Sequence, residues 1–444
     1  MRRLGSLTAA SPAALALGCA IPFIFLHPHY QPHLAVGQVD IYLTDLAILG
    51  AVLVALADGR RRGFAPLRAG RSIWPWLAAF LALLLLSLLW ARSSDHAYSL
   101  GHHAVSALKF VEYASLAPAT ALTVRRPEDR QAFYWAVALW TAFLVLVAAL
   151  QFLGLVDEFA GRRPIQREPS YIGIHDLGAL AGGSLAFLLA GIAIPPAAAD
   201  FVVAGVAGAC GVALAAALDA VGGVIAAAVA IWALARRRGP VGVRRTLAIA
   251  VICAVVTVAA VTLRSSAIVS FLRFLGVERN NVATSGQVQS YSQRVLLGYI
   301  GIKIWIDHPL FGAGWQESHE PHSFEPALPS ARRRFRSQPA YAFPSRAHKW
   351  GVQNGVIQTL ADLGVVGLVL LAGTFVASFR LLIRIARRGR PSLAREALLT
   401  AGWLLVALAT FTGTGLLPGT GVDAQLWIGL GLTAALNYSL HAAP

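Results

Sequence analysis

The sequence predicts an all-α membrane protein, a polytopic bundle of about twelve transmembrane helices. Hydrophobic residues make up 57% of the 444 residues and charged residues only 13%, whereas a soluble domain has about 25% charged residues. A helix needs roughly 20 mostly apolar residues to cross a bilayer, and stretches of that kind recur along the chain. One long polar segment, residues 264–349, interrupts them.

The apolar stretches define the predicted spans and the domain boundaries. The candidates are residues 9–27, 40–57, 73–90, 103–123, 131–155, 173–195, 199–218, 220–235, 246–263, 350–379, 395–413 and 420–440. Two of them fit less well, because 103–123 contains Lys109 and Glu112 and the first half of 350–379 is polar. Spans one to nine therefore fall in 1–263, the polar loop in 264–349, and spans ten to twelve in 350–444.

Arginine clusters set the predicted orientation. They lie at 58–72, 124–130, 236–245 and 380–395, after alternate spans. Short cytoplasmic loops carry such an excess of basic residues, so these clusters and both termini are predicted to be cytoplasmic and 264–349 external. The net charge of +16 then follows largely from topology, and no nucleic-acid partner is expected.

The external loop is basic and is predicted to contain two short interfacial helices. Helices are expected at 265–275 and 292–306, the second ended by His308-Pro309 because proline disfavours helix in the residue before it. The stretch 315–347 is rich in proline, serine and arginine and is expected to be irregular. Such a basic surface indicates an anionic ligand. The loop's basic residues include Arg264, Arg273, Arg279, Arg294, Lys303, Arg332, Arg333, Arg334, Arg336, Arg346 and Lys349.

Arginine is the main candidate for binding phosphate, because its planar guanidinium donates two parallel charge-assisted hydrogen bonds. Arg294 is the leading candidate, since it begins a short helix that leads into the Gly312-Ala313-Gly314 turn. Arg264 opens the loop, and three more arginines precede the span at 173–195: Arg162, Arg163 and Arg167. For residues 332–336 the alternative is contact with lipid headgroups or solvent.

His348 is the candidate general base. It lies at the mouth of a span, beside Lys349 and near Gln353 and Asn354, and imidazole accepts protons near neutral pH. The alternative is a solvated interfacial histidine. Asp219, between two apolar runs, is either a helix cap or a functional carboxylate.

No metal or cofactor is expected. His319-Glu320-Pro321-His322 does not have a zinc-binding spacing, and its proline would disrupt helical projection of the two imidazoles.

Several of these segments together resemble the O-antigen ligase/polymerase family of membrane glycosyltransferases. Arg294 is followed by Pro309-Leu310-Phe311-Gly312-Ala313-Gly314 and, after the long loop, by a span that opens with Asn354, Gln358, Leu363 and Gly364. The stretches 42–45 and 167–170 are also similar. Two positions differ: the family histidine before the asparagine is Gln353 here, with His348 five residues earlier, and a serine-arginine pair near Asp219 is absent.

The resemblance implies a metal-independent transferase in the bacterial inner (cytoplasmic) membrane, with its active site on the external face. The expected donor is an undecaprenyl-pyrophosphate-linked glycan, and the acceptor is a hydroxyl of a lipid, glycan or protein, as in lipopolysaccharide biosynthesis. In that case His348 and Arg294 are catalytic, and Arg162, Arg163, Arg167, Arg264, Lys349, Gln353 and Asn354 bind substrate. The alternatives are a polysaccharide polymerase of the same family and a lipid or polysaccharide transporter.

Overall fold

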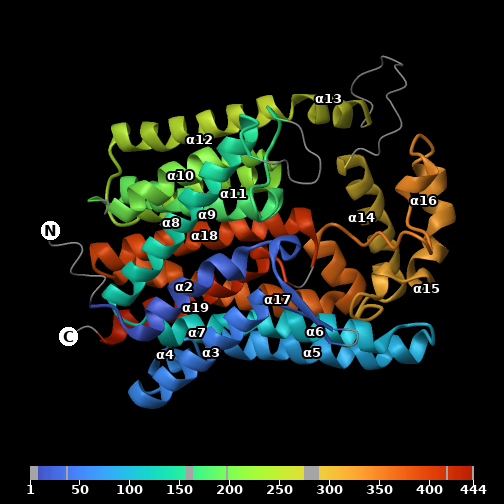
Figure 1. The fold of residues 1–444 in the computed structure, drawn as a ribbon, viewed down its shortest axis with the longest axis horizontal. Coiled ribbons are helices and arrows are strands. Elements are labelled where there is room, and N and C mark those ends of the chain that lie inside the picture. The colour runs from blue at the N-terminus through green and yellow to red at the C-terminus, as the bar shows by residue number, and fades with distance from the viewer. Residues whose placement is uncertain are drawn as a thin grey trace.

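A computed structural model describes residues 9–36, 39–156, 164–196, 199–274, 290–416 and 419–442. The described chain is a bundle of long helices, with a smaller group of helices at one end (Figure 1). The bundle helices are α2 (Pro12–Phe25), α3 (Leu43–Arg62), α5 (Trp74–Ser94), α6 (Leu100–Ala114), α7 (Leu116–Thr123), α8 (Pro127–Phe152), α9 (Ile174–Ala193), α10 (Ala199–Ala215), α11 (Leu218–Arg236), α12 (Val243–Leu263), α17 (Gly355–Arg388), α18 (Pro391–Thr414) and α19 (Gly421–Ala442).

Each predicted span coincides with a helix, although the span at 103–123 is divided into α6 and α7 by a turn at Ser115. Within the described residues, seven helices are long and apolar enough to cross a membrane: α5, α8, α9, α11, α12, α17 and α18. The structure therefore confirms a helical protein with several candidate spans, and the count of twelve stays a prediction. Besides the short helices α4 (Ala65–Ala69) and η1 (Pro28–Tyr30), the described residues include one small hairpin, β1 (His33–Val36) and β2 (Val39–Tyr42).

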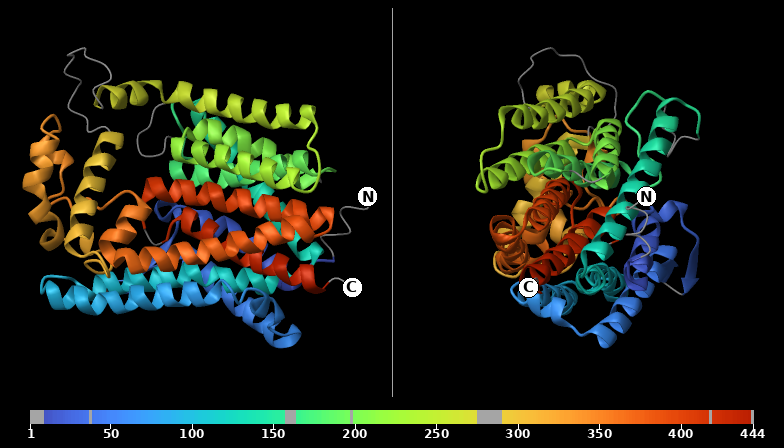
Figure 2. Two further views of the ribbon diagram at one scale, coloured as in Figure 1. Left: turned by 180° about the vertical axis from the view of Figure 1, so that it is seen from behind. Right: turned by 90° about the vertical axis from the view of Figure 1, so that its left-hand side faces the viewer.

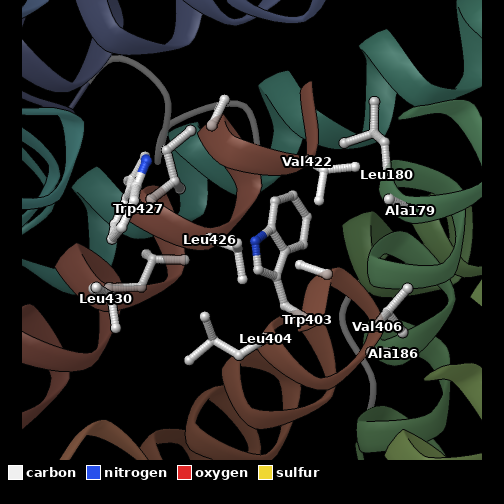
Figure 3. Close-up of a cluster of buried hydrophobic side chains, with 14 of the residues drawn as sticks. Ala179, Leu180, Ala186, Trp403, Leu404, Val406, Val422, Leu426, Trp427 and Leu430 are labelled. Carbon is white, nitrogen blue, oxygen red and sulfur yellow. The ribbon is translucent and has the colours of Figure 1, made fainter. Parts of the chain in front are cut away.

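Small residues allow the central helices to pack closely. Gly182 of α9 lies against Val406 of α18, where a Cβ would come within 2.7 Å of the valine methyl. Trp403 of α18 is buried between α9 and α19 (Figure 3), and its indole Nε1 donates a 2.8 Å hydrogen bond to the carbonyl of Gln425. The glycine-rich start of α9 thus serves close helix packing.

The arginine-rich connections meet at one end of the bundle. Arg125 lies 3.5 Å from Asp58, and the Arg238 guanidinium donates to the carbonyl of Ala386 at 2.6 Å. Arg130 pairs with Glu396 and donates to Ser439 at 2.9 Å. In Figure 2 both ends of the chain also lie on this side, opposite the helices α13 to α16. This arrangement is the one that the predicted topology requires, and the side of the membrane that each end faces stays a prediction.

The far end of the bundle carries the described part of the 264–349 segment. It contains α13 (Ser265–Phe274), α14 (Ser290–Asp307), η3 (Glu317–His319), α15 (Pro321–Phe324), η4 (Glu325–Ala327), α16 (Leu328–Arg334) and η5 (Ala340–Ala342). Helices are present at both expected positions, and α14 ends one residue before His308; their interfacial location stays a prediction. The expectation of an irregular 315–347 stretch is wrong, because its short helical turns enclose a separate apolar core with Leu297, Ile300, Phe324 and Phe343.

A break in α17 joins this group to the bundle. At Gly364 the backbone leaves the helix with φ 66° and ψ −168°, and the groups that the break frees pair with the 309–314 turn. The amide of Val365 donates to the carbonyl of Pro309 at 2.9 Å, and that of Gly314 to the carbonyl of Asp362, also at 2.9 Å. Backbone polar groups within a membrane protein need such partners.

Candidate functional site

A cavity of about 800 Å³ opens beside α14, at the end of the bundle that carries the 264–349 segment. Its walls come from α13, α14, α16, the segment after α16 and the start of α17, with Thr412 of α18 at one edge. The residues that line it are Phe274, Arg294, Val295, Gly298, Tyr299, Ile302, Arg334, Phe335, Ser337, Gln353, Asn354, Ile357 and Thr412. Aromatic and aliphatic surface therefore lies next to two guanidinium groups, a combination that suits an amphipathic anion.

Arg294 is fixed in the cavity wall by hydrogen bonds to α9 and to the connection before α17. Its Nε donates to Gln353 Oε1 at 3.2 Å, and its Nη2 contacts His175 Nε2 at 2.9 Å. Because arginine only donates hydrogen bonds, Nε2 of His175 accepts and the imidazole proton lies on Nδ1. That nitrogen lies 2.8 Å from Asp219 Oδ2. The chain Asp219–His175–Arg294 therefore sets both the tautomer of the histidine and the direction of the guanidinium.

The positive charge at Arg294 is only partly compensated. Burial lowers the pKa of Arg294; the nearby Asp219 carboxylate raises it, and the neighbouring Arg264 lowers it further. Arg264 itself is buried, 8% exposed, with its guanidinium 5.0 Å from the centre of the Tyr291 ring. Its Nε has no hydrogen-bond partner among the described residues. Arg264 therefore acts electrostatically on Arg294, and two partly desolvated guanidinium groups in one region suit an anion with more than one negative charge.

Not all predicted site residues come together here. Arg294, Gln353 and Asn354 line the cavity, and Arg264 lies close to Arg294. Asn354 also caps α17, since its Oδ1 accepts from the amide of Ile357 at 3.0 Å. Arg162 and Arg163 lie outside the described residues, as do Arg279 and the rest of 275–289. Arg167 is half-buried in the segment that leads into α9.

Lys349 and His348 occupy the exposed connection before α17. Lys349 pairs with Glu320 at 2.6 Å, and Glu320 also contacts His103 Nε2 of α6 at 3.2 Å. These hydrogen bonds hold the pKa of Glu320 low, at about 2, although burial opposes them. His348 is exposed, its amide bonds to Ser345, and its ring stacks on Trp350 at 6.0 Å. Glu320 thus links the 264–349 segment to α6. His348 is not among the lining residues of the cavity.

His175 is the site residue that sequence reasoning missed. It lies in the first turn of α9, and the only signal was its position after the arginine-rich stretch 162–167. Asp219 was weighed as a cap or as a functional carboxylate. It is not the residue that caps α11, because the N-cap position is Ala217, and its Oδ2 pairs with His175 instead. Gly413 of α18 leaves room for this carboxylate, since a Cβ there would lie 2.2 Å from Oδ2.

Residues 201–372 match the family model described as O-antigen ligase. This match, over 172 of the 444 residues, supports the resemblance of the chain to the O-antigen ligase/polymerase family. The matched segment runs from α10 into α17 and includes Asp219, Arg264, Arg294 and the break at Gly364; His175 lies outside it. No curated protein matches the chain. The match and the apolar helices together support an O-antigen ligase/polymerase-type membrane enzyme.

Proposed function

We propose that this protein transfers a glycan from an undecaprenyl-pyrophosphate carrier to an acceptor hydroxyl, on the external face of a bacterial inner membrane. The observation that carries the proposal is Arg294, held at the wall of the 800 Å³ cavity by Gln353 and His175 with Arg264 beside it. The donor's diphosphate fits the two guanidinium groups. Its polyprenyl chain fits the apolar wall formed by Val295, Tyr299 and Phe335.

In the proposed reaction the acceptor oxygen attacks the anomeric carbon of the donor sugar. The bond from that carbon to the bridging oxygen breaks, and its electron pair leaves with the lipid diphosphate. Arg294 and Arg264 stabilise the negative charge that develops on this leaving group, which a partly desolvated site does more strongly than water. The cavity holds donor and acceptor together, so positioning contributes as well. In this proposal the two arginines stabilise the charge of the leaving group, and we assign no metal ion to this step.

Two histidines are candidates for receiving the hydroxyl proton. His348 lies on the exposed connection before α17, where it meets an acceptor arriving from outside. His175 is neutral at Nε2 in the Asp219–His175–Arg294 chain, and Nε2 is freed if Arg294 turns to the phosphate. We propose His348 as the proton acceptor and assign His175 to the orientation of Arg294. A polymerase of the same family would use the same site with a growing glycan as acceptor.

The test is the conservative variant Arg294→Lys. Lysine keeps the positive charge but has no planar fork, and one ammonium group does not span Gln353, His175 and a phosphate. Removal of one preorganised donor to a developing anion costs about 10²–10³ in kcat. We expect a loss of about a hundredfold or more in glycan transfer from purified undecaprenyl-pyrophosphate glycan, with the protein still folded.

The matched control is Arg333→Lys. Arg333 is an exposed arginine of α16 in the same external segment and does not line the cavity, so its variant should keep near-normal turnover. Wild-type turnover in Arg294→Lys, or equal losses in the two variants, would rule out Arg294 as the diphosphate ligand. The acceptor that gains the glycan then distinguishes ligase from polymerase.

A further inference from the structure

A second cluster of chemical groups lies apart from the cavity, between the α5–α6 connection and the external segment. Asp95 follows the last turn of α5, Glu317 is in η3 and His322 is in α15. One ligand atom of each lies within 4.8 Å of the other two, and none of the three lines the cavity around Arg294. Figure 1 shows α15 beside the end of α5, so residues more than 200 positions apart meet here.

Glu317 is the central group of this cluster. Its side chain is 1% exposed, and its Oε2 has no hydrogen-bond partner among the described residues. Its Oε1 accepts from the Ser323 hydroxyl at 3.3 Å and lies 3.5 Å from His322 Nδ1. A buried carboxylate oxygen without a donor carries a large desolvation penalty unless a cation meets it.

The charges around Glu317 leave this carboxylate unbalanced. Asp95 is nearby and buried, 8% exposed. Two other carboxylates in the region have partners of their own: Glu320 pairs with Lys349 at 2.6 Å, and Asp362 accepts from the Ser318 amide at 3.0 Å. Burial and, to a smaller extent, the neighbouring Asp95 and Glu320 carboxylates together raise the pKa of Glu317 to about 8. The unpartnered Glu317 oxygen and the buried Asp95 carboxylate beside it therefore leave a position that a cation fits.

We propose that Asp95, Glu317 and His322 bind a divalent transition-metal ion, Zn²⁺ or Mn²⁺, that joins the α5–α6 connection to the external segment. Two carboxylate oxygens and one imidazole nitrogen form a mixed donor set that suits these ions, whereas Mg²⁺ prefers oxygen alone. Zinc bonds of about 2.0–2.2 Å place neighbouring ligand atoms roughly 3.5 Å apart, which is the present distance from Glu317 to His322.

The position of the cluster points to a structural role. Asp95 belongs to the bundle, whereas Glu317 and His322 belong to the group of helices that also contains α16 and its cavity-lining Arg334. An ion bound to all three adds a link between the two parts at a point remote from Arg294. The inference does not depend on the proposed transfer reaction, because the ion is assigned no step in it.

The experiment uses the full chain in detergent, stripped with a chelator and then titrated with Zn²⁺, Mn²⁺ or Mg²⁺ alone. We expect one equivalent of Zn²⁺ or Mn²⁺ to be retained, measured by elemental analysis and by competition with a chromophoric chelator, and little binding of Mg²⁺. The apparent melting temperature should rise with Zn²⁺ or Mn²⁺, because an ion that binds only the folded state stabilises it.

Three variants test the assignment. Glu317→Gln should lower the affinity for that equivalent at least tenfold, since loss of even an outer-shell partner costs about 10–100-fold. His322→Ala should do the same and is the safer variant for folding, because its side chain is 52% exposed. Glu325→Gln, a glutamate of the same segment that pairs with Arg346 at 2.9 Å, should bind metal normally. A wild-type protein that retains no Zn²⁺ or Mn²⁺, or equal affinity in Glu317→Gln, His322→Ala and wild type, overturns the proposal in favour of a protonated Glu317.

Discussion

Replacing Gly364 with alanine should destabilise the protein by about 3 kcal/mol, because the break in α17 depends on this glycine. Its φ of 66° and ψ of −168° fall in a region that only glycine adopts readily, and another residue there is strained by about 1–3 kcal/mol. A Cβ at this position would also lie 2.2 Å from the carbonyl oxygen of Leu310. The 309–314 turn would have to move to relieve that contact.

The movement would weaken the hydrogen bonds that hold the turn against α17. The amides of Val365 and Val366 donate to the carbonyls of Pro309 and Leu310 at 2.9 and 3.1 Å, and each such bond contributes about 0.5–1.5 kcal/mol. Backbone strain and two weakened hydrogen bonds together lower the free energy of unfolding by about 2–6 kcal/mol. We expect a loss in the lower half of this range. The same turn leads to Trp315, which is fully buried, so transfer activity should fall together with stability.

The measurement is the free energy of unfolding of purified protein in a mixed-micelle denaturant titration, followed by circular dichroism. Gly222→Ala is the control, since Gly222 is in helix α11 and a Cβ there meets no atom within 4 Å. That variant should be neutral or more stable by up to about 1 kcal/mol. Equal stability of Gly364→Ala and Gly222→Ala would refute the argument that the break needs glycine.

The remaining predictions concern the base and the topology. His348→Ala should reduce turnover by about 10²–10⁴-fold at saturating donor if His348 receives the proton, while donor binding survives. If Gln353→Ala is impaired and His348→Ala is not, the assignment of the base is wrong and the site works by positioning and leaving-group stabilisation. For topology, single cysteines in a cysteine-free background at Arg333 and Arg390, both exposed positions, should react with a membrane-impermeant thiol reagent from opposite sides of the membrane. Reaction of both from one side contradicts the predicted orientation.

Part of the site could be predicted from the sequence because its residues sit at helix starts. Arg294 was identified as the start of a short amphipathic helix, and Gln353 and Asn354 as the mouth of a span; all three line the cavity. His175 and Asp219 were not assigned to Arg294, because they are 119 and 75 positions away from it in the chain. Local patterns carry no information about which helix ends become neighbours.

Composition and hydropathy were sufficient for the all-α fold class and the approximate positions of the long helices, because a bilayer requires apolar spans of limited length. The sequence also determined which connections are rich in arginine. Only the tertiary structure decided that the 315–347 stretch forms short helices around its own apolar core, since the side chains that bury one another there are contributed by separated turns. Helix packing also brings Asp219 to His175, His175 to Arg294, and Asp95 to Glu317. Buried polar groups need partners, and the tertiary structure determines which groups are close enough to provide them.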